Sequence, residues 1–155
     1  MIRTLHPDGG QSGAEYRTFD TVFSDAGDND PALADSFGTP RREIYDAWYR
    51  LVGVEERDQA SSRTTSYELD ATGRLRQITD PRGVVLSRIT RDLTGQEISI
   101  EHVDAGHRLL AYDAAGNLAL QVDGAGEPIN RSFDELNRII GTSYGGGEPE
   151  TYFYD

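Results

Sequence analysis

Short segments in which apolar and polar residues alternate recur along the chain and are separated by turn-forming residues. The clearest are 98–103 and 118–122, and shorter ones lie at 84–86, 138–140 and 151–154. Period-two alternation with β-branched and aromatic residues is typical of half-buried strands. Helix signals are weak throughout, and the best helix candidate, 43–54, also fits a turn followed by a strand. The pattern therefore predicts an all-β fold.

An aspartate that usually follows an aromatic residue, and precedes a turn, recurs at a nearly constant spacing. The gaps between successive aspartates are 26, 24, 22, 21, 21 and 21, and an aromatic side chain precedes five of the seven. The seven pairs are Phe19-Asp20, Tyr45-Asp46, Leu69-Asp70, Arg91-Asp92, Tyr112-Asp113, Phe133-Asp134 and Tyr154-Asp155. In four consecutive units, a residue that tolerates a left-handed backbone follows three positions later: Gly73, Gly95, Gly116 and Asn137.

Each regular unit also has a second turn about ten residues after the first, at 80–83, 104–106, 123–126 and 144–147. Asp caps such turns, Pro fixes φ, and Gly accepts a positive φ. Each unit is therefore predicted to be two antiparallel strands and two turns, and the chain an extended antiparallel sheet of stacked β-hairpins. The alternative is a β-sandwich with evenly spaced hairpins and no true repeat.

The regularity differs along the chain. Residues 65–155 contain regular repeats with a period of about 21 residues, whereas residues 1–64 form irregular repeat-like units. Residues 24–40 are rich in Asp, Ala, Gly and Pro, and we interpret them as an inserted acidic loop that accounts for the longest gap in the aspartate series.

The repeated aspartates could be metal ligands or acids, but a turn cap needed by every unit explains their phase better. The preceding aromatic residues could stack on a ligand, but we expect them to fill one packing slot per unit. We accordingly treat these pairs, with Gly73, Gly95 and Gly116, as structural residues that define the repeat.

The charge of the chain limits its partners. It has 155 residues and 17.1 kDa, with 15 basic against 27 acidic side chains and a formal net charge of −12. This balance argues against sequence-independent nucleic-acid binding and against docking on anionic lipid. The sequence contains no apolar run of the length that a membrane-spanning helix needs, no signal-peptide pattern and no Cys.

Candidate chemistry is sparse. His102 and His107 lie near Glu101 and Asp104, but polar turn residues explain them better than a metal site. The acidic run at 25–30 lacks the spacing of a calcium loop, and no Gly-x-Ser-x-Gly elbow occurs. We expect no catalytic residues, no metal, no cofactor and no enzymatic activity.

These repeats resemble those of the Rhs or YD-repeat proteins. The similarity is best at Tyr112-Asp113-Ala114-Ala115-Gly116-Asn117-Leu118 and nearly as good at Leu69-Asp70-Ala71-Thr72-Gly73-Arg74-Leu75. The stretch 92–106 looks especially like the C component of bacterial insecticidal toxin complexes. Leu69 and Arg91 stand where Tyr is expected, and Asn137 stands for Gly.

The resemblance implies a sheet that spirals into a hollow shell enclosing a toxic polypeptide, in a secreted or cell-surface protein. About 14 strands spaced ~4.8 Å apart make a strip of roughly 65 Å, about a third of one turn around such a cargo. We therefore expect a fragment of a longer protein, or a truncated copy, partnered by further repeats or another shell protein. Unpaired strand edges predict self-association.

Two other interpretations remain open. One is a cell-surface adhesion or carbohydrate-binding module that uses exposed aromatic residues such as Trp48, Tyr49, Tyr152 and Tyr154. The other is a self-cleaving segment, because Asp80-Pro81-Arg82-Gly83 superficially resembles part of the sequence with which Rhs shells cleave their own chain. Its place between regular repeats favours an ordinary turn.

Overall fold

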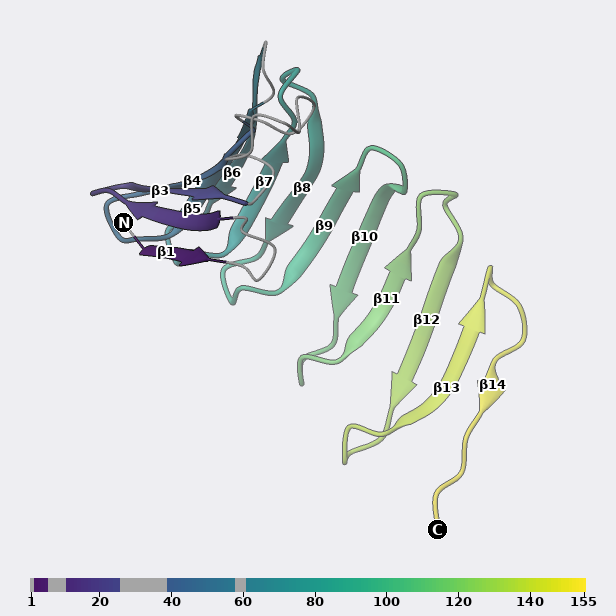
Figure 1. Ribbon diagram of the computed structural model, residues 1–155. Coiled ribbons are helices and arrows are strands. Elements are labelled where there is room, and N and C mark those ends of the chain that lie inside the picture. The colour runs from purple at the N-terminus through teal and green to yellow at the C-terminus, as the bar shows by residue number, and fades with distance from the viewer. Residues whose placement is uncertain (1, 6–10, 26–38, 58–60) are drawn as a thin grey trace. The chain divides into compact units, whose positions relative to one another are not determined.

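The computed structural model describes residues 2–5, 11–25, 39–57 and 61–155, and these residues form one antiparallel sheet (Figure 1). Its 14 described strands follow one another in sequence order, so each strand lies beside its neighbours in the chain. The all-β prediction is confirmed. The strands are β1 (Ile2–Leu5), β2 (Gln11–Tyr16), β3 (Asp20–Ser24), β4 (Arg41–Tyr45), β5 (Leu51–Arg57), β6 (Ser62–Leu69), β7 (Leu75–Thr79), β8 (Val85–Arg91), β9 (Glu97–His102), β10 (Gly106–Tyr112), β11 (Leu118–Val122), β12 (Pro128–Phe133), β13 (Ile139–Tyr144) and β14 (Glu150–Thr151).

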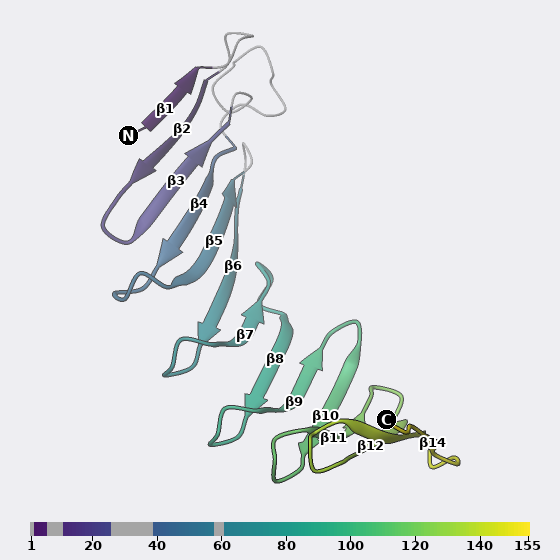
Figure 2. The same ribbon diagram turned by 90° about the horizontal axis from the view of Figure 1, so that it is seen from below.

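The chain divides into two compact units, Met1–Val85 and Leu86–Asp155. Within each unit, successive strands pair as hairpins and then pair with the next hairpin (Figure 2). The segment 43–54 forms the end of β4, a turn and the start of β5, which confirms the turn-and-strand interpretation. Most of the predicted acidic loop lies outside the described residues.

A β-bulge precedes five of the repeated aspartates. The register shifts by one residue just before Tyr45, Leu69, Arg91, Tyr112 and Phe133. Past each shift, the residue before the aspartate faces the residue six positions later, as in Tyr112↔Leu118 and Phe133↔Ile139, so the extra residue of the bulge lies on the following strand. A bulge bends its strand and increases the local twist, so these five hairpins share one distortion beside their aspartate turns.

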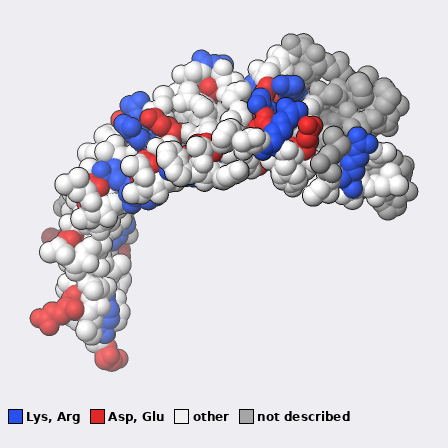
Figure 3. All heavy atoms as spheres, turned by 90° about the vertical axis from the view of Figure 1, so that its left-hand side faces the viewer, with Lys and Arg blue, Asp and Glu red and all other residues white. Residues whose placement is uncertain are grey.

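The sheet has little buried apolar surface. Val54 is the one buried hydrophobic residue among the described residues, and the other buried residues are two glycines, Gly53 and Gly141, and five polar residues: Asp20, Thr21, Glu55, Asp80 and Thr142. Many large apolar side chains, including Trp48, are exposed, and acidic and basic side chains are interspersed on the face seen in Figure 3. A single layer of this kind is stabilised chiefly by backbone pairing and by contacts between neighbouring strands.

The last predicted strand is shorter than expected. The pattern at 151–154 predicts a strand, but β14 covers only Glu150–Thr151. Tyr152 still donates its backbone N–H to the carbonyl oxygen of Ile140 at 3.0 Å, so pairing continues for one residue. β14 has one neighbour in the strand order, which leaves its hydrogen bonding one-sided.

Candidate functional site

The repeated aspartates close their turns with one bonding pattern, which Asp113 illustrates. Its Oδ1 accepts the backbone N–H groups of Ala115 and Asn117, both at 2.9 Å. Its own backbone N–H donates to the carbonyl of Asn117, and Gly116 N–H donates to the carbonyl of Asp113. Four bonds therefore fix the corner, as expected for an Asp side chain that captures its own following backbone.

The same four bonds recur at seven places, which we call the aspartate corners. Their donor–acceptor distances span 2.8 to 3.3 Å. The corners are Asp46, Asp70, Asp80, Asp92, Asp113, Asp123 and Asp134. Five belong to the repeated aspartate series, and Asp80 and Asp123 begin two of the second turns.

The second carboxylate oxygen is occupied at most corners. Oδ2 accepts from Arg50 Nε at 2.7 Å in the corner of Asp46, and from Arg138 Nε at 2.7 Å in the corner of Asp134. Arg74, Arg82 and Asn117 do the same at Asp70, Asp80 and Asp113. All 15 basic residues of the chain are Arg, whose planar fork suits carboxylate pairing better than the point charge of Lys.

These bonds stabilise the ionised carboxylates. The Asn117 amide and backbone N–H lower the pKa of Asp113, and the Thr72 hydroxyl and Arg74 N–H lower that of Asp70. Bonds from the residues two and four positions on also lower the pKa values at Asp80, Asp92 and Asp134. At Asp46, burial alone would raise the pKa, but the bonds from Arg50 outweigh it. A carboxylate bound in this way is a poor proton donor and has little capacity left for a metal.

The fourth residue of each corner has a left-handed backbone. φ is +87° at Gly73, +93° at Gly95 and +90° at Gly116. Asn137 and Tyr49 take the same position with φ of +59° and +58°. Asn tolerates this region, whereas Tyr49 is strained there, which the surrounding bonds of the Asp46 corner must offset.

Three of the corners also contact the next corner along the sheet. Gln96 Nε2 donates to Gly116 O at 3.3 Å, and Asn117 Nδ2 donates to Asn137 Oδ1 at 2.9 Å. In the first unit, the Arg50 side chain lies over Gly73. A Cβ added to Gly73 would lie 3.3 Å from Arg50 Nη1. In all three cases, the last residue of one corner reaches the fourth residue of the next.

Two of the three tyrosines that precede the aspartates form a second link between hairpins, whereas the Tyr45 hydroxyl bonds Glu43 on its own strand. Tyr112 Oη donates to Glu97 O at 3.0 Å, and Tyr154 Oη donates to Ile139 O at 2.7 Å. The sequence separation of donor and acceptor is 15 in both cases, so the two bonds are equivalent in the repeat. The Arg138 guanidinium also lies 4.5 Å from the Tyr154 ring centroid, within cation–π range. These bonds give a reason for Tyr at this position beyond filling a packing slot.

Arg91, which stands where Tyr is expected, is compensated by its partner. It faces Glu97 across the bulge, and its Nη2 lies 2.6 Å from Glu97 Oε1. The equivalent facing pairs are Tyr45↔Leu51, Leu69↔Leu75, Tyr112↔Leu118 and Phe133↔Ile139. An ion pair therefore replaces an apolar pair in one unit.

The first and last members of the series lie outside the corner geometry. Asp20 opens β3 after a turn instead of capping one, and Phe19 lies in the connection before it. Asp155 is the last residue of the chain, and Tyr154 makes the contacts described above. Asp20 is buried and pairs with Arg42 of β4.

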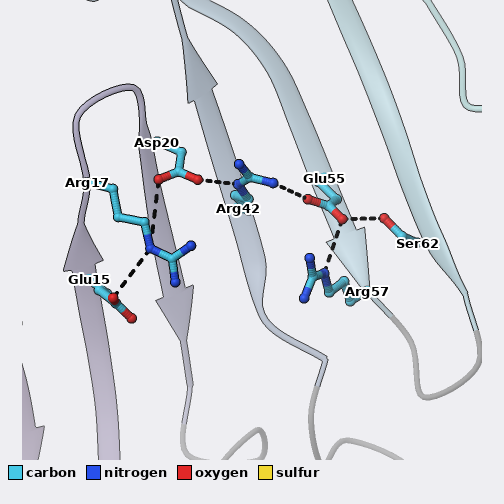
Figure 4. Close-up of polar contacts among 7 residues, drawn as sticks. All are labelled: Glu15, Arg17, Asp20, Arg42, Glu55, Arg57 and Ser62. Atoms are coloured by element: carbon cyan, nitrogen blue, oxygen red, sulfur yellow. Dashed lines mark hydrogen bonds and ion pairs between the residues drawn. The ribbon is translucent and has the colours of Figure 1, made fainter.

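Arg42 is the centre of a charged network that crosses β2 to β6 (Figure 4). It bonds Asp20 on one side and Glu55 on the other, the latter at 3.2 Å. Ser62 and Arg57 also bond Glu55, and together these partners lower its pKa to about 2. Arg17 Nε joins the network at Asp20 Oδ1, 4.0 Å away, and extends it to Glu15 Oε1, 3.3 Å away. Sequence analysis missed this network, and its one sequence signal is opposite charges at positions that prove to face each other, such as Arg42↔Glu55.

The described residues offer little for catalysis. Both oxygens of Asp80 accept hydrogen bonds, from the N–H groups of Arg82 and Val84 and from the Arg82 side chain, as in the other aspartate corners. His107 bonds Ser99, and His102 accepts the N–H of Asp104. In the part of the chain that the structure describes, no group of three or more acidic or His side chains is placed to hold a metal ion. Over the same residues, no helix is long and apolar enough to cross a membrane.

Comparison with known proteins agrees with the repeat. Residues 45–85 match the sequence family described as RHS Repeat, and the resemblance to Rhs repeats is thereby confirmed. This match covers the corners of Asp46 and Asp70 and the Asp80 turn. No curated protein sequence matches the chain.

Solved structures share the fold over most of the chain. The crystal structure of TcdB2-TccC3 without its hypervariable C-terminal region matches with a TM-score of 0.79 at 22% identity, covering 92% of this chain and 8% of that one. Complete TcdB2-TccC3 gives 0.78 at 22% identity, covering 97% and 8%. The Photorhabdus luminescens Tc holotoxin pore gives 0.77 at 22% identity, covering 92% and 8%. This chain thus spans about a twelfth of the length of the toxin chains that it matches.

Proposed function

We propose that this chain is a non-enzymatic wall segment of an Rhs-repeat shell that encloses or carries a toxin polypeptide. The observation behind the proposal is the repetition of one bonded corner seven times in a single-layer sheet. A globular enzyme needs a closed core around its site. Here Val54 is the one buried apolar residue among those described.

The links between corners explain how such a wall is extended. Three corners bond or closely contact the next corner, and the Asp113 corner both receives such a contact from Gln96 and gives one to Asn137, so the same contact can be repeated from hairpin to hairpin. β1 and β14 each have one neighbour in the strand order and can pair with further strands. The expected partners are therefore further repeats of a longer chain or a second shell protein, in an extracellular toxin assembly.

The test is protection of a cargo. The chain is expressed together with the segments encoded on either side of it, and the segment C-terminal to it is probed by limited proteolysis. We expect it to resist protease in the intact protein and to be cleaved when Asp113 and Asp134 are both changed to Ala. The matched control changes Glu68 and Glu101, two exposed acidic residues outside the corners, to Ala. Equal cleavage of the downstream polypeptide in all three proteins would refute enclosure.

A carbohydrate-binding role has one observation in its favour. Trp48 is 75% exposed at the tip of the Asp46 corner, and Tyr49 beside it is also exposed. Aromatic rings presented in this way can stack on sugars. Binding on a glycan array that is abolished by Trp48→Ala and retained by Tyr144→Ala would favour this function over a shell wall.

A further inference from the structure

A small cavity in the first unit has a wall of arginines. Its volume is about 100 Å³, and its lining residues are Arg17, Val22, Pro40, Arg42 and Arg57. The three guanidiniums come from the β2–β3 connection, β4 and β5. The aspartate corners and the exposed aromatic residues do not contribute to it, and its three arginines belong to the charged network around Arg42.

The carboxylates that pair with these arginines do not line the cavity. Arg17 bonds Glu15 through Nε at 3.3 Å, Arg57 bonds Glu55 through Nε at 3.1 Å, and Arg42 bonds Asp20 and Glu55 through Nε and Nη1. Figure 4 shows Arg42 held between its two carboxylates, with the Arg17 and Arg57 guanidiniums on the same side of that row. Among the described residues, these bonds leave five of the six terminal nitrogens of the three arginines available as donors.

The size and charge of the cavity select a class of ligand. A cavity of about 100 Å³ is large enough for one small oxoanion. Guanidinium forks bind carboxylate and phosphate oxygens in pairs. Two forks satisfy the two oxygens of a carboxylate, whereas three forks suit the three or four oxygens of a phosphate group.

We propose that the cavity formed by Arg17, Arg42 and Arg57 binds a tetrahedral oxoanion, either free phosphate or the phosphate group of a monoester. The paired carboxylates hold the guanidiniums in place through Nε, and the terminal nitrogens donate to the ligand. Val22 and Pro40 form the rest of the lining. Because Arg42 is shared by two carboxylates, Arg17 and Arg57 supply most of the donors.

Isothermal titration calorimetry with inorganic phosphate tests the site in the full chain. We expect saturable binding at one site, weakened about tenfold by Arg57→Gln and by Arg17→Gln, since each removes charged hydrogen bonds. The control is Arg76→Gln, which removes another arginine of the first unit that pairs with one carboxylate, Glu68, at 3.4 Å. Circular dichroism checks that each variant folds, and Arg57→Lys, which keeps the charge but loses the fork, is expected to fall between Arg57→Gln and the wild type.

Two further ligands define the specificity. O-phosphoserine binding more tightly than inorganic phosphate identifies a monoester as the ligand, and the reverse order identifies free phosphate. Acetate is expected to bind much more weakly than either. Absence of saturable phosphate binding, equal responses to acetate and phosphate, or an Arg76→Gln loss equal to that of Arg57→Gln would overturn the proposal.

Discussion

The ion pair of Arg91 and Glu97 allows the repeat to be tested within one chain. In the other bulges, an apolar or aromatic residue faces an aliphatic one, so the double change Arg91→Tyr with Glu97→Leu copies the pair formed by Tyr112 and Leu118. If the bulge is one structure repeated, this unit should accept the pair found elsewhere. Each single change should be worse than both together.

The magnitude follows from burial. The Arg91 side chain is 14% exposed and that of Glu97 is 38% exposed, with 2.6 Å between Nη2 and Oε1. Fully exposed ion pairs contribute about 0.2–1 kcal/mol, whereas breaking a buried pair costs about 3–5 kcal/mol. For this half-buried pair, we expect each single change to cost about 1–2 kcal/mol and the double variant to lie near the wild type. The coupling energy is then about 2 kcal/mol, within the range measured for residues in direct contact.

Urea unfolding followed by circular dichroism gives the four stabilities of the double-mutant cycle. The control cycle uses Arg88 and Glu101, which face each other in the same strands but are both about half exposed, with 3.6 Å between charged atoms. We expect a coupling below about 1 kcal/mol there. Additive effects of the two changes at Arg91 and Glu97, within about 0.5 kcal/mol, would refute the idea that the pair substitutes for an apolar one.

Three further predictions concern stability. Gly124→Ala should lower the free energy of urea unfolding by about 2 kcal/mol, because the added Cβ would lie 2.5 Å from the carbonyl oxygen of Ala105 in the neighbouring turn. Gly83→Ala should lower it by only about 1 kcal/mol, because φ is +82° there but the space around the added Cβ is open. Tyr112→Phe should lose about 1 kcal/mol with its bond to the preceding hairpin, and Phe133→Tyr, which places a hydroxyl at the equivalent position, should gain a similar amount; no change in either unfolding midpoint would contradict the link. The pKa of Glu55 is about 2 in the folded protein and about 4.3 in the unfolded chain, so the stability that ionised Glu55 contributes is complete above pH 4.3 and is lost as the pH falls through 2. As the pH is lowered, the urea unfolding midpoint should therefore fall less steeply in Glu55→Gln than in the wild type. Identical pH dependence of the two midpoints would count against the network.

The repeated part of the fold could be predicted because its information is local. Asp70 and Gly73, three positions apart, are enough to indicate a capped turn with a left-handed position, and the structure has that turn. The alternating segments between such turns indicate strands, and a constant spacing places consecutive hairpins side by side. Each inference needs only a few neighbouring residues, so it holds without knowledge of the rest of the chain.

Features that depend on register could not be predicted in the same way. The bond of Arg42 to Asp20 joins residues 22 positions apart, across a segment whose length differs from every other unit. The phase of Asp20 in the aspartate series indicates a corner, but the pairing of β3 with β4 places it inside the sheet instead. The bonds of Tyr112 and Tyr154 to the preceding hairpin also require the register, although their common sequence separation of 15 could have suggested them.

The most direct test of the account is the order and register of the strands in solution. Nuclear Overhauser contacts between backbone protons of facing residues report both, and the structure predicts them for Ser99 with Leu109 and for Asn130 with Ser143. Finding these contacts, together with strand-type chemical shifts between the aspartate corners, would agree with a row of hairpins in sequence order. Contacts between strands that are not neighbours in the chain, or helical chemical shifts in 86–155, would contradict it.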